Sequence, residues 1–235
     1  MLFSTLQRVV RVVVTAAFVF AIAACESKPS SQTGNHYLDV LSKREPKILE
    51  THPQIAMRDG GRLLINLQGG GAIKFENSPT CLESECVRYT LYRYDHREEI
   101  VVVWREVYES YSVVMVDRKN GATLSVPGAP GLSPNRKYWA AAEYNIEDES
   151  GDAVIVRRDT DGFKIEASGL GRGFSQYGCS YAGWIDTVSV RLMCLQDDLE
   201  VYDEVVVTRS SDGHWLPAKT GRSVEEKDLD LPPED

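Results

Sequence analysis

The residues with the clearest capacity for chemistry are the cysteines, of which the chain has five. Four lie in the body of the sequence, at Cys81, Cys86, Cys179 and Cys194. Thiolates can hold zinc, and a zinc site is one alternative, but the CxxxxC spacing differs from the usual ligand pairs. In an oxidising compartment an even number of thiols predicts disulfides instead. Of the three possible connectivities we favour the local one, Cys81–Cys86 and Cys179–Cys194.

The hairpin between Cys179 and Cys194 supports this choice. Asp186-Thr187 lies at the midpoint between the two cysteines. A two-residue turn there would place the cysteines directly opposite each other on paired strands, at a separation that a disulfide can bridge.

The sequence shows no pattern typical of catalysis. The histidines form no HExxH, HxH or Cys/His box, and the chain contains neither a G-x-S-x-G nucleophile elbow nor a P-loop. We therefore expect no catalytic residue, no metal and no cofactor, and we favour a protein that is not an enzyme. The alternative is a hydrolase whose acidic residues are dispersed, since paired carboxylates need not be neighbours in sequence.

The first 25 residues have the features of an export signal. Arg8 and Arg11 precede an apolar run over residues 12–24, which is shorter than the roughly 20 residues that span a bilayer. The run ends in Ile22-Ala23-Ala24-Cys25, which resembles the lipobox of bacterial lipoproteins. The resemblance implies that residues 1–24 are a lipoprotein signal peptide and that Cys25 is acylated. The alternatives are an ordinary cleaved signal and an uncleaved anchor.

Two or three acyl chains would anchor the protein stably to a membrane. In enterobacterial lipoproteins an Asp after the lipidated cysteine resembles a signal for retention in the inner membrane, and this chain has Glu26. The resemblance therefore implies the periplasmic face of the outer membrane, with the inner membrane as the alternative. The periplasm is oxidising, which agrees with the predicted disulfides.

The charge of the chain restricts its partners. Removing residues 1–24 removes two arginines and no acid, which leaves 24 basic and 35 acidic residues and a net charge of −11. Nucleic-acid binding depends on neutralising phosphates with basic residues, so we expect no nucleic acid as partner. The expected partners are the membrane, through the lipid, and another envelope protein.

The pattern of the chain beyond the signal predicts an all-β fold. From Arg58 onward apolar and polar residues alternate with a period of two, and the runs are separated by turns such as Lys119-Asn120-Gly121. We expect a flexible tether over residues 25–36, a single β domain over 37–220, and an acidic disordered tail over 221–235. A short helix at 37–44 is expected to stop before Pro46.

The strands also repeat. Residues 154–162 and 205–213 share the pattern V-(I/V)-V-x-R-x-x-D-G, and residues 113–121 are a looser copy. The copies predict a repeated four-stranded unit, with a chance match of common residues as the alternative. Asp117–Gly121, followed by Ser133, Pro134, Arg136 and Ala140–Ala142, resembles the repeat junction of WD40-like and TolB-like β-propellers, although Asn135-Arg136 replaces its Asp-Gly.

This resemblance implies a small or incomplete β-propeller-like domain of antiparallel hairpins, and a β-sandwich is the alternative fold. The stretch Tyr108–Gly121 also resembles a group of uncharacterised bacterial periplasmic proteins. Both resemblances concern residues that shape turns and strands, so neither implies a reaction.

Aromatic residues are concentrated in the middle third of the chain. Half of the residues on a strand face the core, and the others can form a binding surface because Tyr and Trp are frequent in interface hot spots. The alternative is that the aromatic residues pack in the core and in cross-strand pairs. The candidate surface consists of Tyr92, Tyr94, Trp104, Tyr108, Tyr111 and Trp139.

Together these observations predict a lipid-anchored periplasmic module for binding or assembly in the bacterial cell envelope. An acidic protein would also suit a basic toxin, so an immunity protein against a periplasmic toxin is one alternative. The dispersed-acid hydrolase is the other.

Overall fold

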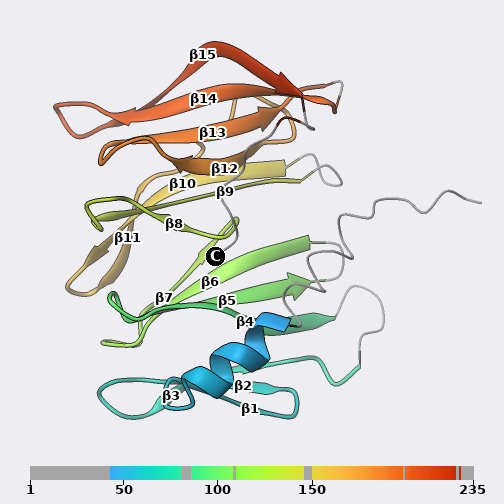
Figure 1. Cartoon of the computed structure of the whole chain (residues 1–235), viewed down its shortest axis with the longest axis vertical. Helices are drawn as coiled ribbons and strands as arrows, with labels where there is room; N and C mark the ends of the chain where they lie inside the picture. The colour runs from blue at the N-terminus through green and yellow to red at the C-terminus, as the bar shows by residue number, and fades with distance from the viewer. Residues whose placement is uncertain are drawn as a thin grey trace, which may run out of the picture.

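Strands dominate the computed structural model, which describes residues 43–80, 86–107, 110–145, 150–197, 199–225 and 228. In these ranges fifteen strands form four antiparallel sheets, which follow one another in chain order as a stack (Figure 1). The prediction of an all-β fold built from antiparallel hairpins is confirmed. The expected signal peptide, Cys25 and the tether lie outside the described residues, as do Cys81 and Tyr108.

Each sheet is a meander in which every strand pairs with the next one along the chain. The first sheet contains β1 (Ala56–Asp59), β2 (Arg62–Asn66) and β3 (Ala72–Glu76). The second contains β4 (Val87–Asp95), β5 (Ile100–Val107), β6 (Ser110–Asp117) and β7 (Thr123–Val126). The third contains β8 (Gly131–Leu132), β9 (Tyr138–Asn145), β10 (Ser150–Asp159) and β11 (Gly162–Ala167). The fourth contains β12 (Cys179–Trp184), β13 (Ser189–Leu195), β14 (Val201–Arg209) and β15 (Trp215–Glu225).

The two middle sheets are covered on both faces, which explains continuous apolar runs such as Ile100–Trp104 of β5. In β5, Val102 and Trp104 pack toward the third sheet, whereas Val101 and Val103 pack toward the first. Strands β9 and β10 divide their residues in the same way between the second and fourth sheets. The core therefore consists of a layer of side chains between each two neighbouring sheets.

The end sheets are covered by a neighbouring sheet on one face only, although in the fourth sheet Met193, Leu195 and Tyr202 form a smaller buried cluster of their own. In the first sheet Leu63 and Ile65 are buried against the second sheet, while Met57 on the opposite face is exposed. In the fourth sheet Trp215 is buried toward the third, while the next residue of β15, Leu216, is exposed. The stack thus has two open ends, as an incomplete propeller would.

One position of the repeated sequence pattern carries side chains that connect neighbouring sheets. Its copies form the third strand and the following turn of the second, third and fourth sheets, and they carry Asp117, Arg158 and Arg209 at the same place. Arg158 reaches across the sheets to Asp117, with 2.7 Å from Nε to Oδ2, and Nη2 binds the same carboxylate. Asp117 is fully buried. This ion pair joins the third sheet to the second.

Further contacts between sheets surround that pair at the turn end of the strands. Arg158 Nη1 donates to the backbone oxygen of Glu98 (2.6 Å), and Arg136 Nε donates to the Glu98 carboxylate (2.6 Å). The Glu98 carboxylate raises the pKa of Arg136 through this hydrogen bond. Arg209, the third copy, lies over the ring of Tyr138, 5.7 Å from its centroid, and so contacts the third sheet through an aromatic ring.

The first sheet and the helix before it close the free edge of β4. Glu45 binds the guanidinium of Arg58 through both carboxylate oxygens, at 2.7 and 2.6 Å. Three amides on this edge donate to side chains: Val87 N to Ser78 Oγ, Tyr89 N to Asn77 Oδ1 and Leu91 N to Glu45 Oε2. These side chains occupy hydrogen-bonding groups that could otherwise pair with a strand of another chain.

The helix differs from the prediction. It covers residues 43–51 in the described part of the chain and continues through Pro46, so the expected end at residue 44 is wrong. Ile48 and Leu49 pack against the core between the first and second sheets, and His52 N closes the last turn on Ile48 O at 2.8 Å. This apolar packing stabilises the helix although it contains a proline.

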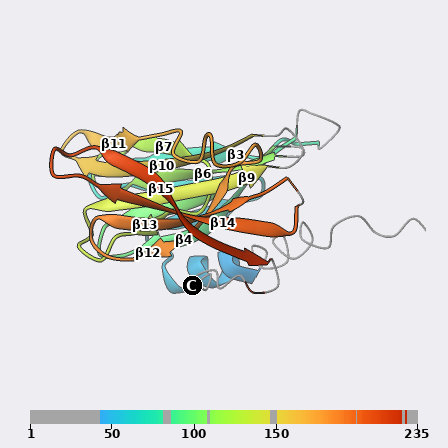
Figure 2. The same cartoon turned by 90° about the horizontal axis from the view of Figure 1, so that it is seen from above.

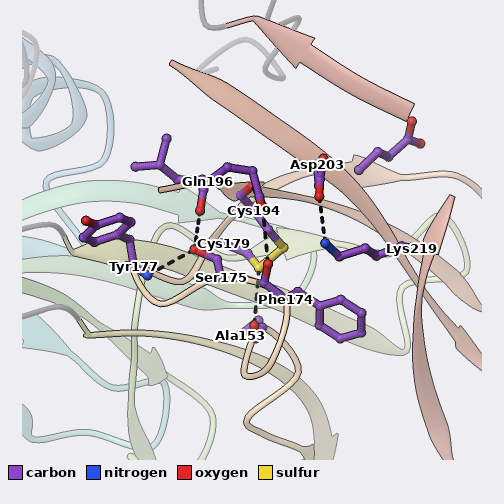
Figure 3. Close-up of a disulfide and its surroundings, with 12 residues drawn as sticks. Ala153, Phe174, Ser175, Tyr177, Cys179, Cys194, Gln196, Asp203 and Lys219 are labelled. Atoms are coloured by element: carbon purple, nitrogen blue, oxygen red, sulfur yellow. Dashed lines mark hydrogen bonds and ion pairs between the residues drawn. A yellow bond between two sulfur atoms is a disulfide. The ribbon is translucent and has the colours of Figure 1, made fainter. Parts of the chain in front are cut away.

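The disulfide between Cys179 and Cys194 is present, which confirms the predicted pairing (Figure 3). The two cysteines are direct partners on β12 and β13, fully buried between the third and fourth sheets. The predicted two-residue turn is wrong, because the register shifts between Tyr181 and Gly183. The bulge lengthens the loop, which is closed by Ile185 N donating to Ser189 O (2.9 Å).

Two other sequence predictions concern residues next to the limits of the described ranges. Cys86 is disulfide-bonded, and its expected partner, Cys81, lies outside the described ranges. The tail predicted from residue 221 begins too early, since β15 continues to Glu225. Val224 explains the difference, because it packs against Met193, Leu195 and Tyr202.

No helix in the described ranges has both the length and the apolarity needed to cross a membrane.

Replacing both Cys179 and Cys194 by alanine should lower the free energy of unfolding by about 3 kcal/mol, because the crosslink restricts a loop of this length in the unfolded chain. Urea unfolding under non-reducing conditions measures the change. The matched control replaces Cys81 and Cys86 by alanine. That loop is shorter, and we expect a loss of about 2 kcal/mol. Unchanged stability in the Cys179/Cys194 variant would contradict a disulfide at this place.

Candidate functional site

The aromatic residues predicted to form a binding surface are mostly buried. Tyr92, Trp104 and Trp139 retain 4, 5 and 2 % of their exposure, so their assignment to a surface is wrong and the core alternative describes them. They are buried because both faces of the middle sheets are covered. Tyr111 is 36 % exposed and stacks on Trp104, with ring centroids 4.5 Å apart. Tyr108 lies outside the described residues.

Tyr94 takes part in contacts between the first and second sheets. Its hydroxyl donates to Glu99 Oε2 (2.9 Å), and burial followed by this hydrogen bond raises its pKa. Arg118 binds the same Glu99 carboxylate and donates to the Asn66 backbone oxygen of the first sheet (2.7 Å). Tyr94 therefore belongs to a structural network. Of the predicted surface residues that the structure describes, Tyr111 is the exposed one.

A different group of side chains meets where three sheets converge. The register of β4 shifts between Leu91 and Arg93, and such a bulge can turn the side chains of two successive residues toward one face. Tyr92 packs on the face of the third sheet, and Arg93 Nη2 binds the backbone oxygen of Pro130, just before β8. Arg93 is half-buried, and burial is the main cause that lowers its pKa.

The fourth sheet reaches the same point from β12. Trp184 Nε1 donates to the Gly131 backbone oxygen (2.9 Å), next to the carbonyl that Arg93 binds. The Tyr181 side chain lies against Gly131, and burial raises the pKa of its hydroxyl to about 12. The short segment Pro130-Gly131 is therefore held by an arginine from the second sheet and by two aromatic side chains from the fourth.

The helix adds a second cation to this group. The Arg44 guanidinium lies over the ring of Tyr92, 5.1 Å from its centroid, and its charge contributes to the lowered pKa of Arg93. Figure 2 shows β4, β12 and the helix on one side of the stack, with β7 and β11 on the opposite side. We call the side that holds β4, β8 and β12 the first-strand side, and we call Arg93, Tyr92, Tyr181 and Trp184 the Arg93 cluster.

Sequence reasoning missed the Arg93 cluster because its members come from the second and fourth sheets and meet a segment that leads into the third. The alternating pattern of β4 assigns Arg93 to one face without indicating the bulge, and Gly131 looks like an ordinary turn residue. One signal was available: Arg93 is a charged residue within the aromatic run Tyr89–Tyr94 of a predicted strand.

The chemistry of the Arg93 cluster is that of binding. A guanidinium offers a planar fork of donors, and tyrosine and tryptophan add apolar area with a polar tip. No group of three or more His, Cys, Asp or Glu side chains in the described ranges could hold a metal ion.

A shallow pocket of about 380 Å³ on the first sheet is a second candidate, lined by Asp59, Gly61, Arg62, Glu76, Asn77 and Pro79. Its main charges compensate one another. Glu76 pairs with Lys74 (2.5 Å) and with Arg62 (3.2 Å), and these hydrogen bonds lower the Glu76 pKa, with Lys74 as the larger cause. The three side chains are exposed, where ion pairs contribute little. The Arg93 cluster is therefore the better candidate.

Comparisons of the chain with protein-family models, with curated proteins and with solved structures return no match.

Changing Gly131 to alanine should destabilise the Arg93 cluster. The added Cβ would lie 2.0 Å from the Tyr181 hydroxyl oxygen, so the ring must move, which typically costs about 1–3 kcal/mol in the free energy of unfolding. Urea unfolding measures the loss. In a Tyr181→Ala background the same change should cost much less.

Gly69→Ala is the matched control, because a Cβ there meets nothing within 4 Å. An equal loss from Gly131→Ala with and without the Tyr181 ring would contradict the close contact between these two residues.

Proposed function

We propose that this protein is a lipid-anchored binding or assembly module of the bacterial cell envelope, held at the periplasmic face of the outer membrane. The observation that carries the proposal is the combination of a lipobox-like sequence at Cys25 with a buried disulfide between Cys179 and Cys194. A disulfide in a core is typical of proteins that leave the reducing cytoplasm.

The fold supports a role in binding. Four stacked sheets, joined by ion pairs such as Asp117–Arg158, form a scaffold that can hold side chains in fixed positions. The Arg93 cluster presents arginine, tyrosine and tryptophan, which are the residue types enriched in interface hot spots. A flexible tether over residues 25–36 would let the domain meet a partner away from the membrane.

The proposal predicts the fate of a Cys25→Ala variant. Without the thiol no lipid can be attached, so the variant should leave the outer-membrane fraction and either become soluble or remain as an uncut precursor. Membrane fractionation with immunoblotting measures the distribution. Glu26→Asp is the matched variant: it keeps the lipid, and under the enterobacterial sorting rule it should move the protein to the inner membrane. Cys25→Ala protein that stays in the outer membrane would contradict the anchor.

The same strains test the partner. After crosslinking and solubilisation in detergent, an envelope protein should co-purify with the wild-type chain and be depleted with Cys25→Ala, as measured by quantitative mass spectrometry. If the same proteins are recovered at equal levels from both strains, an anchored assembly role is contradicted.

A further inference from the structure

Arg93 differs from other arginines that join the elements of this fold. Arg58, Arg118, Arg136 and Arg158 each have a carboxylate oxygen within 2.7 Å of a guanidinium nitrogen. Arg93 forms no ion pair with any carboxylate in the described ranges, and its protein acceptor there is the uncharged backbone oxygen of Pro130. A partly desolvated charge without a counter-charge is unfavourable, and a bound anion would remove that cost.

The nearby charges of the described residues do not supply that anion. Asp95 favours the charged form of Arg93 from a distance, but its own carboxylate is engaged by Arg136 Nη2 at 3.3 Å. Arg44 adds a second positive charge on the same side and acts against Arg93. Among the described residues, no carboxylate therefore pairs with the Arg93 guanidinium.

The donors of Arg93 are suited to a planar anion. A guanidinium has five N–H groups in a fork, and the hydrogen bond to Pro130 accounts for one. The fork matches the two oxygens of a carboxylate, which it can bind through two parallel hydrogen bonds. Tyr181 and Trp184 stand beside it on β12, where they can cover the apolar part of a peptide that carries the carboxylate.

We infer that Arg93 is the anchor of a carboxylate-binding site on the first-strand side, and that its ligand is an acidic peptide segment. The inference rests on the proposed function, because it names the chemistry of the partner that a binding module would take. The segment has two possible sources: a separate envelope protein, or the acidic residues 226–235 of this chain, which contain five of its acids.

The test uses a fluorescent synthetic peptide with the sequence of residues 226–235, titrated by anisotropy into two forms of the detergent-solubilised lipoprotein. One form is the full chain and the other ends after Glu225, where β15 ends. The peptide should bind the shortened chain, and Arg93→Gln should weaken binding about tenfold or more, as expected for the loss of a charge-assisted pair of hydrogen bonds. A control peptide with Asn and Gln in place of Asp and Glu should not bind.

Arg88→Gln is the matched control, because Arg88 is an exposed arginine of the same strand. It should leave the affinity within about twofold, since exposed charges contribute little. Arg93→Lys keeps the charge and a donor for the Pro130 oxygen but lacks the fork, so it should bind more weakly than wild type. This variant provides the readout if thermal unfolding shows that Arg93→Gln is not folded.

Comparison of the two forms identifies the source of the ligand. Equal affinity for both forms supports a site open to a separate partner, whereas weaker binding to the full chain supports occupation by its own residues 226–235. The inference is overturned if the shortened chain does not bind the peptide, if the neutral peptide binds equally well, or if Arg88→Gln weakens binding as much as Arg93→Gln. These outcomes do not depend on Cys25, so they are separate from failure of the membrane-anchor proposal.

Discussion

The buried ion pair between Asp117 and Arg158 is the contact on which the stack depends most. Neighbouring sheets meet through apolar side chains, which supply most of the free energy of association but are not directional. A fully buried carboxylate is tolerated only where its partner is in place, so the pair permits one alignment of the third sheet on the second. The repeated pattern creates it by placing Asp in one copy and Arg in the next at the same position.

Polar or charged side chains also connect the other pairs of neighbouring sheets. Between the first and second sheets, Glu45 binds Arg58 and caps the edge of β4, and between the third and fourth sheets Arg209 lies over Tyr138. The Arg93 cluster assembles where side chains of the second and fourth sheets meet a segment that enters the third, so it requires the alignment of these three sheets. A change in the alignment of the second sheet on the third would separate Arg93 from Pro130.

Much of the fold could be predicted from local patterns. Alternation and turn residues indicated the strands, and the two cysteines gave the pairing of β12 with β13 although the bulge near Tyr181 altered their turn. Contacts between sheets were not predictable, because they join residues whose proximity depends on how whole sheets stack. Asp117 and Arg158 align in the repeat, but the sequence does not show that their side chains meet. The prediction of an aromatic binding surface was wrong for the same reason, since Trp104 and Trp139 are buried by the sheets on both sides of their own.

A double-mutant cycle on Asp117 and Arg158 tests this account most directly. The four proteins are the wild type, Asp117→Asn, Arg158→Met and the double variant. Urea denaturation gives the free energy of unfolding of each. We predict a coupling energy of about 2 kcal/mol or more between the two side chains, as for residues in one buried network. The exposed pair Arg157–Asp159, at 3.3 Å, should couple by less than about 1 kcal/mol. If the effects of the Asp117 and Arg158 changes add to within about 0.5 kcal/mol, the claim that this ion pair fixes the alignment of the two sheets is contradicted.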